Sequence, residues 1–204
     1  PPHGPSDNPN EYEASSCSLV PTTDGSAYLM NARYVNYRID ERGAYHMRSA
    51  DGHVKTKNAL VPLNSQFQPT ESPRFLEEDY QRHPSNIEGL EDMRLFYYDD
   101  KLHFIASSKD ISSLGKVVMT MGKYDAKQAR AYNVHVLEPP TPSDCQKNWI
   151  PVPNKYLDHI PAAKERINVI YGWCPLQIGS VIPEEADIHG GKLHIHTVQN
   201  TPTS

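Results

Sequence analysis

The chain has 204 residues, of which 37% are hydrophobic and 22% charged, and its formal net charge is −5. This length is enough for one domain with its own core, or for part of a larger repeat architecture. The negative charge disfavours unspecific nucleic-acid binding, which requires a basic surface. No apolar run approaches the roughly 20 residues that span a bilayer, so we expect neither a nucleic-acid partner nor a membrane span.

The composition points to a loop-rich, β-dominated protein, because 18 prolines break helices and 12 tyrosines suit half-buried pleated surfaces. The three cysteines are widely spaced and form no C-x-x-C pair, which predicts neither a disulfide framework nor a zinc site. His194 and His196 share a strand face, but further ligands are not evident, so we expect no metal and no cofactor. With no signal-peptide pattern, we expect a reducing, cytoplasmic or virion-associated location.

Residues 1–16 carry proline, serine, asparagine and glutamate, with almost nothing to bury. This composition predicts an extended Pro-rich arm that is either disordered or bound to a neighbouring part, followed by one domain over residues 17–204. Because the chain opens on Pro1 rather than a methionine, we expect it to be processed, truncated or part of a longer product.

After this arm, strand-like runs alternate with turn signals. Asp24 and Gly25 favour a tight hairpin turn. The predicted strands cover residues 28–39, 53–63, 95–98, 102–106, 117–124, 131–137, 168–182 and 192–199. A Pro-interrupted connection is expected over residues 64–88, and one modest helix over Pro161–Ile167.

The Asp-Gly, Asp-Asp-Lys and Gly-Gly-Lys turns fall between strand pairs, near positions 24, 99 and 190. Their spacing is too long and uneven for a short solenoid repeat, but it suits the blades of a propeller with long inter-blade loops. A β-sandwich fits the same pattern. The sequence therefore predicts an all-β fold and leaves these two architectures open.

The strand predicted over residues 28–39 is polar on both sides. Alternation places Asn31 and Arg33 on one face, and Asn36 and Arg38 on the other. Such a strand is either an exposed edge, which is the commoner case, or an interior strand whose polar groups line a cavity or pair with neighbours.

The motif Glu91-Asp92-Met93-Arg94 places two carboxylates and a cation at the start of a strand. Alternation faces Glu91 and Asp92 oppositely and puts Asp92 and Arg94 on one face, about 7 Å apart. An arginine this close to a carboxylate makes either an ion pair that links strands or a charged site with access to water.

The segment CQKNWIPVP, residues 145–153, brings together Lys147, Asn148 and Trp149. This combination is typical of sugar sites, because an aromatic plane stacks on the C–H groups of the ring while amides and charges bind the hydroxyls. Trp149 is equally compatible with an ordinary core position.

Taken together and in this order, the segments ARYVNYRI, GLEDMRLF, KNWIP and VIYGWCPLQIG resemble a family of predicted five-bladed β-propellers common among large DNA viruses. That family is distantly similar to glycoside hydrolase families 43, 68 and 130. The resemblance covers roughly residues 18–182 and implies a five-bladed β-propeller type, of which about three to four blades fit into this chain. In such propellers the inner strands surround a central funnel where sugar binds.

The resemblance also implies roles for the acidic motif. By similarity to the phosphorylase branch, whose matching motif is Glu-Asp-Pro-Arg, Asp92 would be the proton donor and Arg94 a binder of substrate or phosphate. Here Met93 replaces the proline, and Gln146 stands where relatives often carry Glu before Lys-Asn-Trp. That missing carboxylate argues against inverting hydrolysis, which needs two carboxyl groups roughly 6.5–9.5 Å apart.

Phosphorolysis needs one acid and cations for phosphate, and pure binding needs no acid. We therefore expect a domain that binds or processes a glycan or sugar phosphate, with Asp92 as catalytic residue. The expected substrate-binding residues are Arg38, Glu91, Arg94, Lys147, Asn148 and Trp149. The alternative is a non-catalytic structural or interaction protein, such as a virion component, because three blades cannot close a five-bladed ring and open sheet edges need a covering partner.

Overall fold

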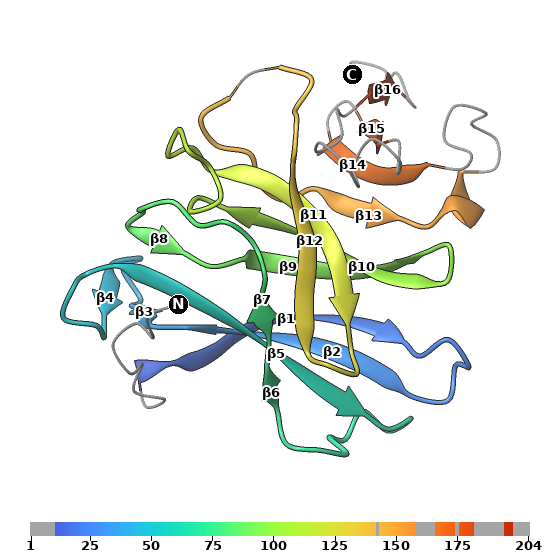
Figure 1. Cartoon of the computed structure of the whole chain (residues 1–204), viewed down its shortest axis with the longest axis horizontal. Coiled ribbons are helices and arrows are strands. Elements are labelled where there is room, and N and C mark those ends of the chain that lie inside the picture. The colour runs from blue at the N-terminus through green and yellow to red at the C-terminus, as the bar shows by residue number, and fades with distance from the viewer. Residues whose placement is uncertain (1–10, 142, 158–165, 174–175, 182–193, 198–204) are drawn as a thin grey trace.

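The computed structural model describes residues 11–141, 143–157, 166–173, 176–181 and 194–197 (Figure 1). These residues form strands joined by turns and loops, with a 3-10 helix at Asn154–Tyr156 and no α-helix among them. None of them belongs to a helix with the length and hydropathy that a membrane crossing requires. The all-β class expected from the sequence is confirmed.

Within the described ranges, the strands form three larger sheets and one small hairpin, all of them open. The first sheet has the order β1 (Glu13–Pro21), β2 (Tyr28–Val35), β5 (Val54–Leu63), β6 (Arg74–Phe75), with β8 (Ile87–Glu88) beside β5. The second has the order β7 (Glu77–Glu78), β12 (Arg130–Leu137), β11 (Val118–Asp125), β10 (Lys101–Ser108), β9 (Glu91–Tyr98). The third has the order β13 (Ile150–Val152), β14 (Ile167–Trp173), β15 (Leu176–Val181), β16 (His194–Thr197). The hairpin consists of β3 (Tyr37–Ile39) and β4 (Tyr45–Met47).

The strands β9 to β12 pair in sequence order, each antiparallel to the next, and β13 to β16 do the same. The predicted turn at position 99 joins β9 to β10, with Asp99 and Asp100 at φ 49° and 56°. Two consecutive left-handed residues are the signature of the type I′ turn, whose twist matches that of the flanking strands. Aspartate tolerates this conformation better than most residues, so the Asp-Asp pair explains the tight hairpin.

Sheet two is the middle layer, because its two faces pack against different cores. Leu60 of sheet one packs with Leu95, Phe104 and Ala131 of sheet two in one buried cluster. On the other side, a second cluster joins sheet two to sheet three. The members of this second cluster are Ile105, Met119, Met121, Leu137, Trp149, Ile167, Val169 and Val181.

One strand of each sheet, β1, β9 and β13, lies where the three sheets meet (Figure 1). β9 contacts β1 on one side and β13 on the other, and the backbone N–H of Leu95 donates to Ser18 Oγ at 2.8 Å. A cavity of about 790 Å³ opens between these three strands and the start of β14. The space where sheets one, two and three converge is thus lined by β1, β9 and β13.

The polar strand predicted over residues 28–39 is interior, because β2 lies between β1 and β5. The interpretation of this strand as an exposed edge was therefore wrong. Asn31 is buried and its Nδ2 donates to Asn58 Oδ1 at 2.9 Å, so the polar groups are paired within the sheet. The strand also breaks at Asn36, which is fully buried and whose side chain bonds to His53 O and Lys55 N.

Other boundaries differ from the expectation as well. β1 begins at Glu13, inside the segment expected as an arm, and residues 1–10 lie outside the described ranges. The connection expected over residues 64–88 contains β6, β7 and β8, which are each two residues long. Of the helix expected over Pro161–Ile167, residues 161–165 lie outside the described ranges and Ile167 begins β14. The turn near position 190 also lies outside them.

The side chain of Asp24 stabilises the β1–β2 turn through hydrogen bonds whose contribution depends on pH. The Asp24 carboxylate accepts bonds from Thr22 Oγ1 at 2.5 Å, Ser26 Oγ at 2.8 Å and Ser26 N at 3.1 Å. These bonds, the Thr22 hydroxyl first, lower the pKa of Asp24 from 3.8 to about 2. A pKa lowered by folding contributes stability above the unfolded-state value, and this contribution is lost as the pH falls toward the folded-state value.

We therefore expect Asp24→Asn to be less stable than wild type by a constant amount near neutral pH. The difference should shrink as the pH falls from about 4 to about 2. Urea denaturation at several pH values measures it. A difference that stays constant down to pH 2 would show that the carboxylate charge of Asp24 makes no contribution.

Candidate functional site

The candidate site begins where β9 starts, at a close approach of the chain to β5. Gly89 has φ 95°, and a Cβ placed on it would lie 2.3 Å from the carbonyl oxygen of Thr56. Only glycine fits this position, because any side chain would clash with Thr56 and would strain the backbone at this positive φ. The backbone N–H of Gly89 donates to Asp110 Oδ2 at 3.0 Å, which fixes the residues just before β9.

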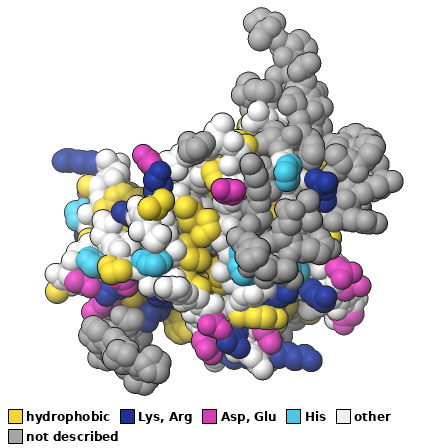
Figure 2. Space-filling view, turned by 45° about the horizontal axis from the view of Figure 1, so that its top comes forward, with side chains coloured by type: hydrophobic (Ala, Val, Ile, Leu, Met, Phe, Trp, Pro, Cys, Tyr) yellow, Lys and Arg dark blue, Asp and Glu magenta, His cyan; other side chains and the backbone are white. Residues whose placement is uncertain are grey.

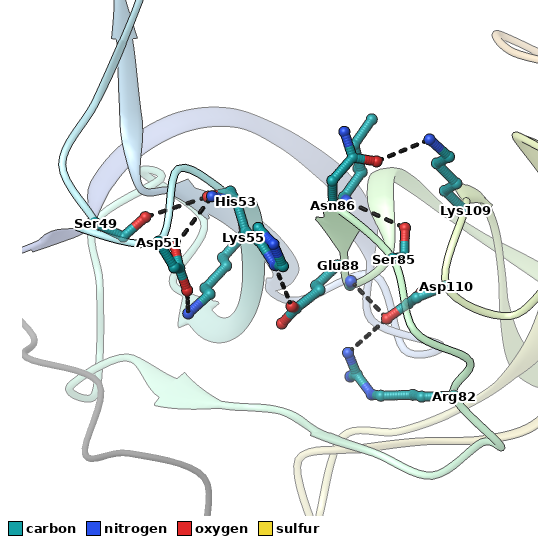
Figure 3. Close-up of polar contacts among 12 residues, drawn as sticks. Ser49, Asp51, His53, Lys55, Arg82, Ser85, Asn86, Glu88, Lys109 and Asp110 are labelled. Atoms are coloured by element: carbon teal, nitrogen blue, oxygen red, sulfur yellow. Dashed lines mark hydrogen bonds and ion pairs between the residues drawn. The ribbon is translucent and has the colours of Figure 1, made fainter. Parts of the chain in front are cut away.

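Asp110 is the anchor of this turn and is 1% exposed. It also accepts bonds from Ser108 Oγ at 2.6 Å, Arg82 Nη1 at 2.8 Å and Tyr80 OH at 3.0 Å. Figure 3 shows Arg82 and Asp110 pointing toward each other beside two more exposed contacts, His53 with Glu88 and Asn86 with Lys109. A buried carboxylate with this many donors makes the position of β9 rigid.

Glu91 and Asp92 converge on one arginine. Arg33 Nη2 lies 2.6 Å from Glu91 Oε1, and Arg33 Nη1 lies 2.6 Å from Asp92 Oδ1. The prediction that strand alternation faces these two carboxylates oppositely was wrong. Asp92 has φ 51°, a left-handed conformation that breaks the alternation, and the pairing of β9 with β10 shifts register close by, between Ile105 and Ser107.

The two carboxylates, Arg33 and Lys147 form a unit that we call the Arg33 cluster. The side chains of Arg33 and Glu91 are each 9% exposed, whereas Asp92 and Lys147 are 39% and 41% exposed. Lys147 Nζ lies 3.9 Å from Glu91 Oε2, which is an ion pair but too long for a hydrogen bond. Arg33 and Glu91 thus form the floor of the cluster, and Asp92 and Lys147 face solvent.

Two tyrosines that the sequence reasoning did not single out flank this cluster. Tyr37 OH lies 3.5 Å from Arg33 Nη2, and the rings of Tyr37 and Tyr45 are 5.0 Å apart. Burial raises the pKa of Tyr37, an effect that the positive charge of Arg33 opposes and the negative charges of Glu91 and Asp92 reinforce. Tyr45 is 59% exposed. The signal for Tyr37 was present, because alternation places it on the same strand face as Arg33.

The Lys-Asn-Trp segment divides between surface and core. Trp149 is 1% exposed, its Nε1–H donates to Gln146 Oε1 at 3.3 Å, and its ring meets that of Tyr171 edge-on at 5.4 Å. Neither ring face of Trp149 is open to a sugar in this arrangement, so it occupies the core position that the sequence left open. Asn148 is exposed and has φ 64°, which turns the chain between Lys147 and Trp149.

The remaining predicted residues lie in other surroundings. Arg38 is exposed on β3 and lines a surface depression with residues 39–42. Arg94 lines the cavity between β1, β9 and β13, which Asp92 does not line. The structure therefore brings together Glu91, Asp92 and Lys147, and it places Arg38, Arg94 and Trp149 elsewhere.

The Arg33 cluster suits ligands that carry hydroxyls or a phosphate, since carboxylate oxygens accept and ammonium groups donate hydrogen bonds. Among the described residues, no group of three His, Cys, Asp or Glu side chains is placed to hold a metal ion. On the face drawn in Figure 2, basic and acidic side chains are interspersed, with hydrophobic side chains between them. No family model, curated protein or solved structure matches this chain.

Proposed function

We propose that this chain is a β-propeller-type domain that binds a glycan or sugar phosphate at the Arg33 cluster. The observation that carries the proposal is Asp92, a partly exposed carboxylate at φ 51° that is paired with a buried arginine, Arg33, which Tyr37 also contacts. Non-glycine residues in this conformation are uncommon and gather at binding and active sites.

The propeller arrangement is supported by the order of the strands. Propeller blades are four-stranded antiparallel sheets arranged around a central channel. The strands β9–β12 and β13–β16 have this up-and-down order, and β1, β9 and β13 lie together where the three sheets converge. The first sheet fits the same scheme once the β3–β4 hairpin is regarded as an insertion between β2 and β5. In this scheme, β1, β9 and β13 are the inner strands of three blades.

Glycan binding is supported by the side chains around Asp92. Tyr45 offers an exposed ring for the C–H face of a sugar, and it packs against Tyr37, whose hydroxyl reaches Arg33. Around Arg33, the cluster offers an acceptor, Asp92, and a donor, Lys147. Aromatic faces combined with a few placed polar groups are typical of small-ligand sites. The long contact of Lys147 with Glu91 leaves its donors available to a hydroxyl or phosphate.

Binding fits this geometry better than hydrolysis. Glycoside hydrolysis requires one carboxylic acid that carries a proton, and a second carboxylate opposite it. Here Glu91 and Asp92 are both ion-paired to Arg33 at 2.6 Å, so each acts as the negative partner of one guanidinium. Recognition of hydroxyls by Asp92 requires no proton transfer.

The proposal is tested by a glycan-array screen on the folded chain, with and without phosphate, followed by titration of any ligand found. We expect Tyr45→Ala to weaken binding by about tenfold, as loss of one aromatic stacking contact does. The matched control is Tyr156→Ala, another exposed tyrosine, which lies on the 3-10 helix. This control should keep wild-type affinity.

Two outcomes would contradict the proposal. Absence of selective binding by a demonstrably folded chain would favour the structural or interaction role. Turnover of a glycoside that Asp92→Asn abolishes would instead make Asp92 a catalytic acid.

A further inference from the structure

The cavity between β1, β9 and β13 is separate from the Arg33 cluster and has a different character. Its volume of about 790 Å³ lies within the roughly 300–1,000 Å³ of small-molecule sites. Its walls include Phe96 and Tyr97 from β9, Val20 from β1, and Ile150 and Val152 from β13. The lining is therefore mainly apolar and comes from all three sheets.

Arg94 is the distinctive polar group of this cavity. It is only partly exposed, and its guanidinium has no hydrogen-bond or ion-pair partner among the described residues, whereas its backbone pairs with Ile105 of β10. The structure thus holds a guanidinium beside apolar walls without a carboxylate to balance it. Guanidinium groups in such positions bind carboxylates, sulfonates or phosphates through two parallel hydrogen bonds.

The other charged residues that line the cavity do not cancel this charge. Lys155 is a second cation, and Asp99 is the acid among the lining residues. The side chain of Asp99 is 78% exposed and lies 3.7 Å from Lys101 Nζ. Its carboxylate is thus paired with Lys101 on the exposed β9–β10 hairpin. The charge of the lining is therefore positive on balance.

We propose that this cavity binds a small organic anion with an apolar or aromatic body, and that Arg94 binds its carboxylate or other anionic group. The apolar walls would contact the body of the ligand, and the unpaired guanidinium would select for its charge. This site does not depend on the glycan site, because the two share no residue.

The test compares two probes with the same aromatic body, 2-naphthoate and the neutral 2-naphthamide, by isothermal titration of the full chain. We expect wild type to bind the anion at least about tenfold more tightly than the amide, because charge-assisted bonds to arginine are the stronger ones. Arg94→Met should remove this preference and leave the affinity for the amide unchanged. On titration with naphthoate, backbone amide signals of residues 94–98, Ile150 and Val152 should shift in a ¹⁵N-labelled chain.

The matched control is Arg42→Met, an exposed arginine on the β3–β4 turn that does not line the cavity. It should retain the preference for the anion, and so should Tyr45→Ala, which alters the glycan site alone. The proposal is overturned if neither probe binds the folded chain, if Arg94→Met keeps the preference, or if the shifted signals lie outside β9 and β13.

Discussion

Replacing Arg33 with methionine is expected to lower the free energy of unfolding by about 3–5 kcal/mol, the usual cost of removing one partner of a buried ion pair. Arg33 is buried and is bonded to both Glu91 and Asp92 at 2.6 Å. Without it, the Glu91 carboxylate stays buried, with Lys147 at 3.9 Å as the nearest remaining cation. Most of the loss should come from the buried, unpaired Glu91 carboxylate, because Asp92 is partly exposed and can be hydrated instead.

Urea denaturation measures this loss, and a double variant separates its cause. Arg33→Met combined with Glu91→Gln removes the uncompensated charge, so it should recover roughly 0.5–3 kcal/mol relative to the sum of the single variants. Arg42→Met, at an exposed position, should change stability by less than about 0.5 kcal/mol. A loss of under about 1 kcal/mol for Arg33→Met would mean that the pair behaves as a surface salt bridge.

The strands were largely predictable because their signals are local. The runs 95–98 and 102–106, which form much of β9 and β10, are visible in the sequence as apolar stretches, and so are the Asp-Gly and Asp-Asp turns. The position of a strand within its sheet is a long-range property. The sequence alone did not show that β5 pairs with β2 and makes it interior, nor that two-residue strands add to the edges.

The site was predictable in its residue types and not in its geometry. Glu91, Asp92 and Lys147 were identified from their chemistry, and the structure places them together. Strand alternation failed at Asp92 because a single left-handed residue inverts the direction of the side chain, and no sequence pattern marks it. Arg33 was missed as their partner because it lies 58 residues from Glu91 along the chain, and only the packing of sheet one on sheet two joins them.

Replacing Trp149 with alanine is expected to cost about 3–5 kcal/mol of folding free energy, as large-to-small changes of buried aromatic residues do. Trp149 is 1% exposed and belongs to the core between sheets two and three, and its indole N–H bonds to Gln146. If Trp149 were instead exposed as a sugar-stacking platform, its replacement would lower the free energy of unfolding by less than about 0.5 kcal/mol in the absence of ligand. The size of the loss in urea denaturation therefore distinguishes a core position from a sugar platform.

The chain carries its own control for this experiment, because its second tryptophan, Trp173, is 64% exposed at the end of β14. Trp173→Ala should leave stability within about 0.5 kcal/mol of wild type. In Trp173→Phe the remaining indole is Trp149, whose fluorescence should be blue-shifted and resist quenching by iodide until the chain unfolds. Ready quenching in the folded chain would contradict the core position of Trp149 and would make its ring available to a sugar. If Trp149→Ala instead weakens glycan binding and also unfolds the chain, the lost binding reflects the lost fold, which leaves Tyr45→Ala as the variant that tests the site.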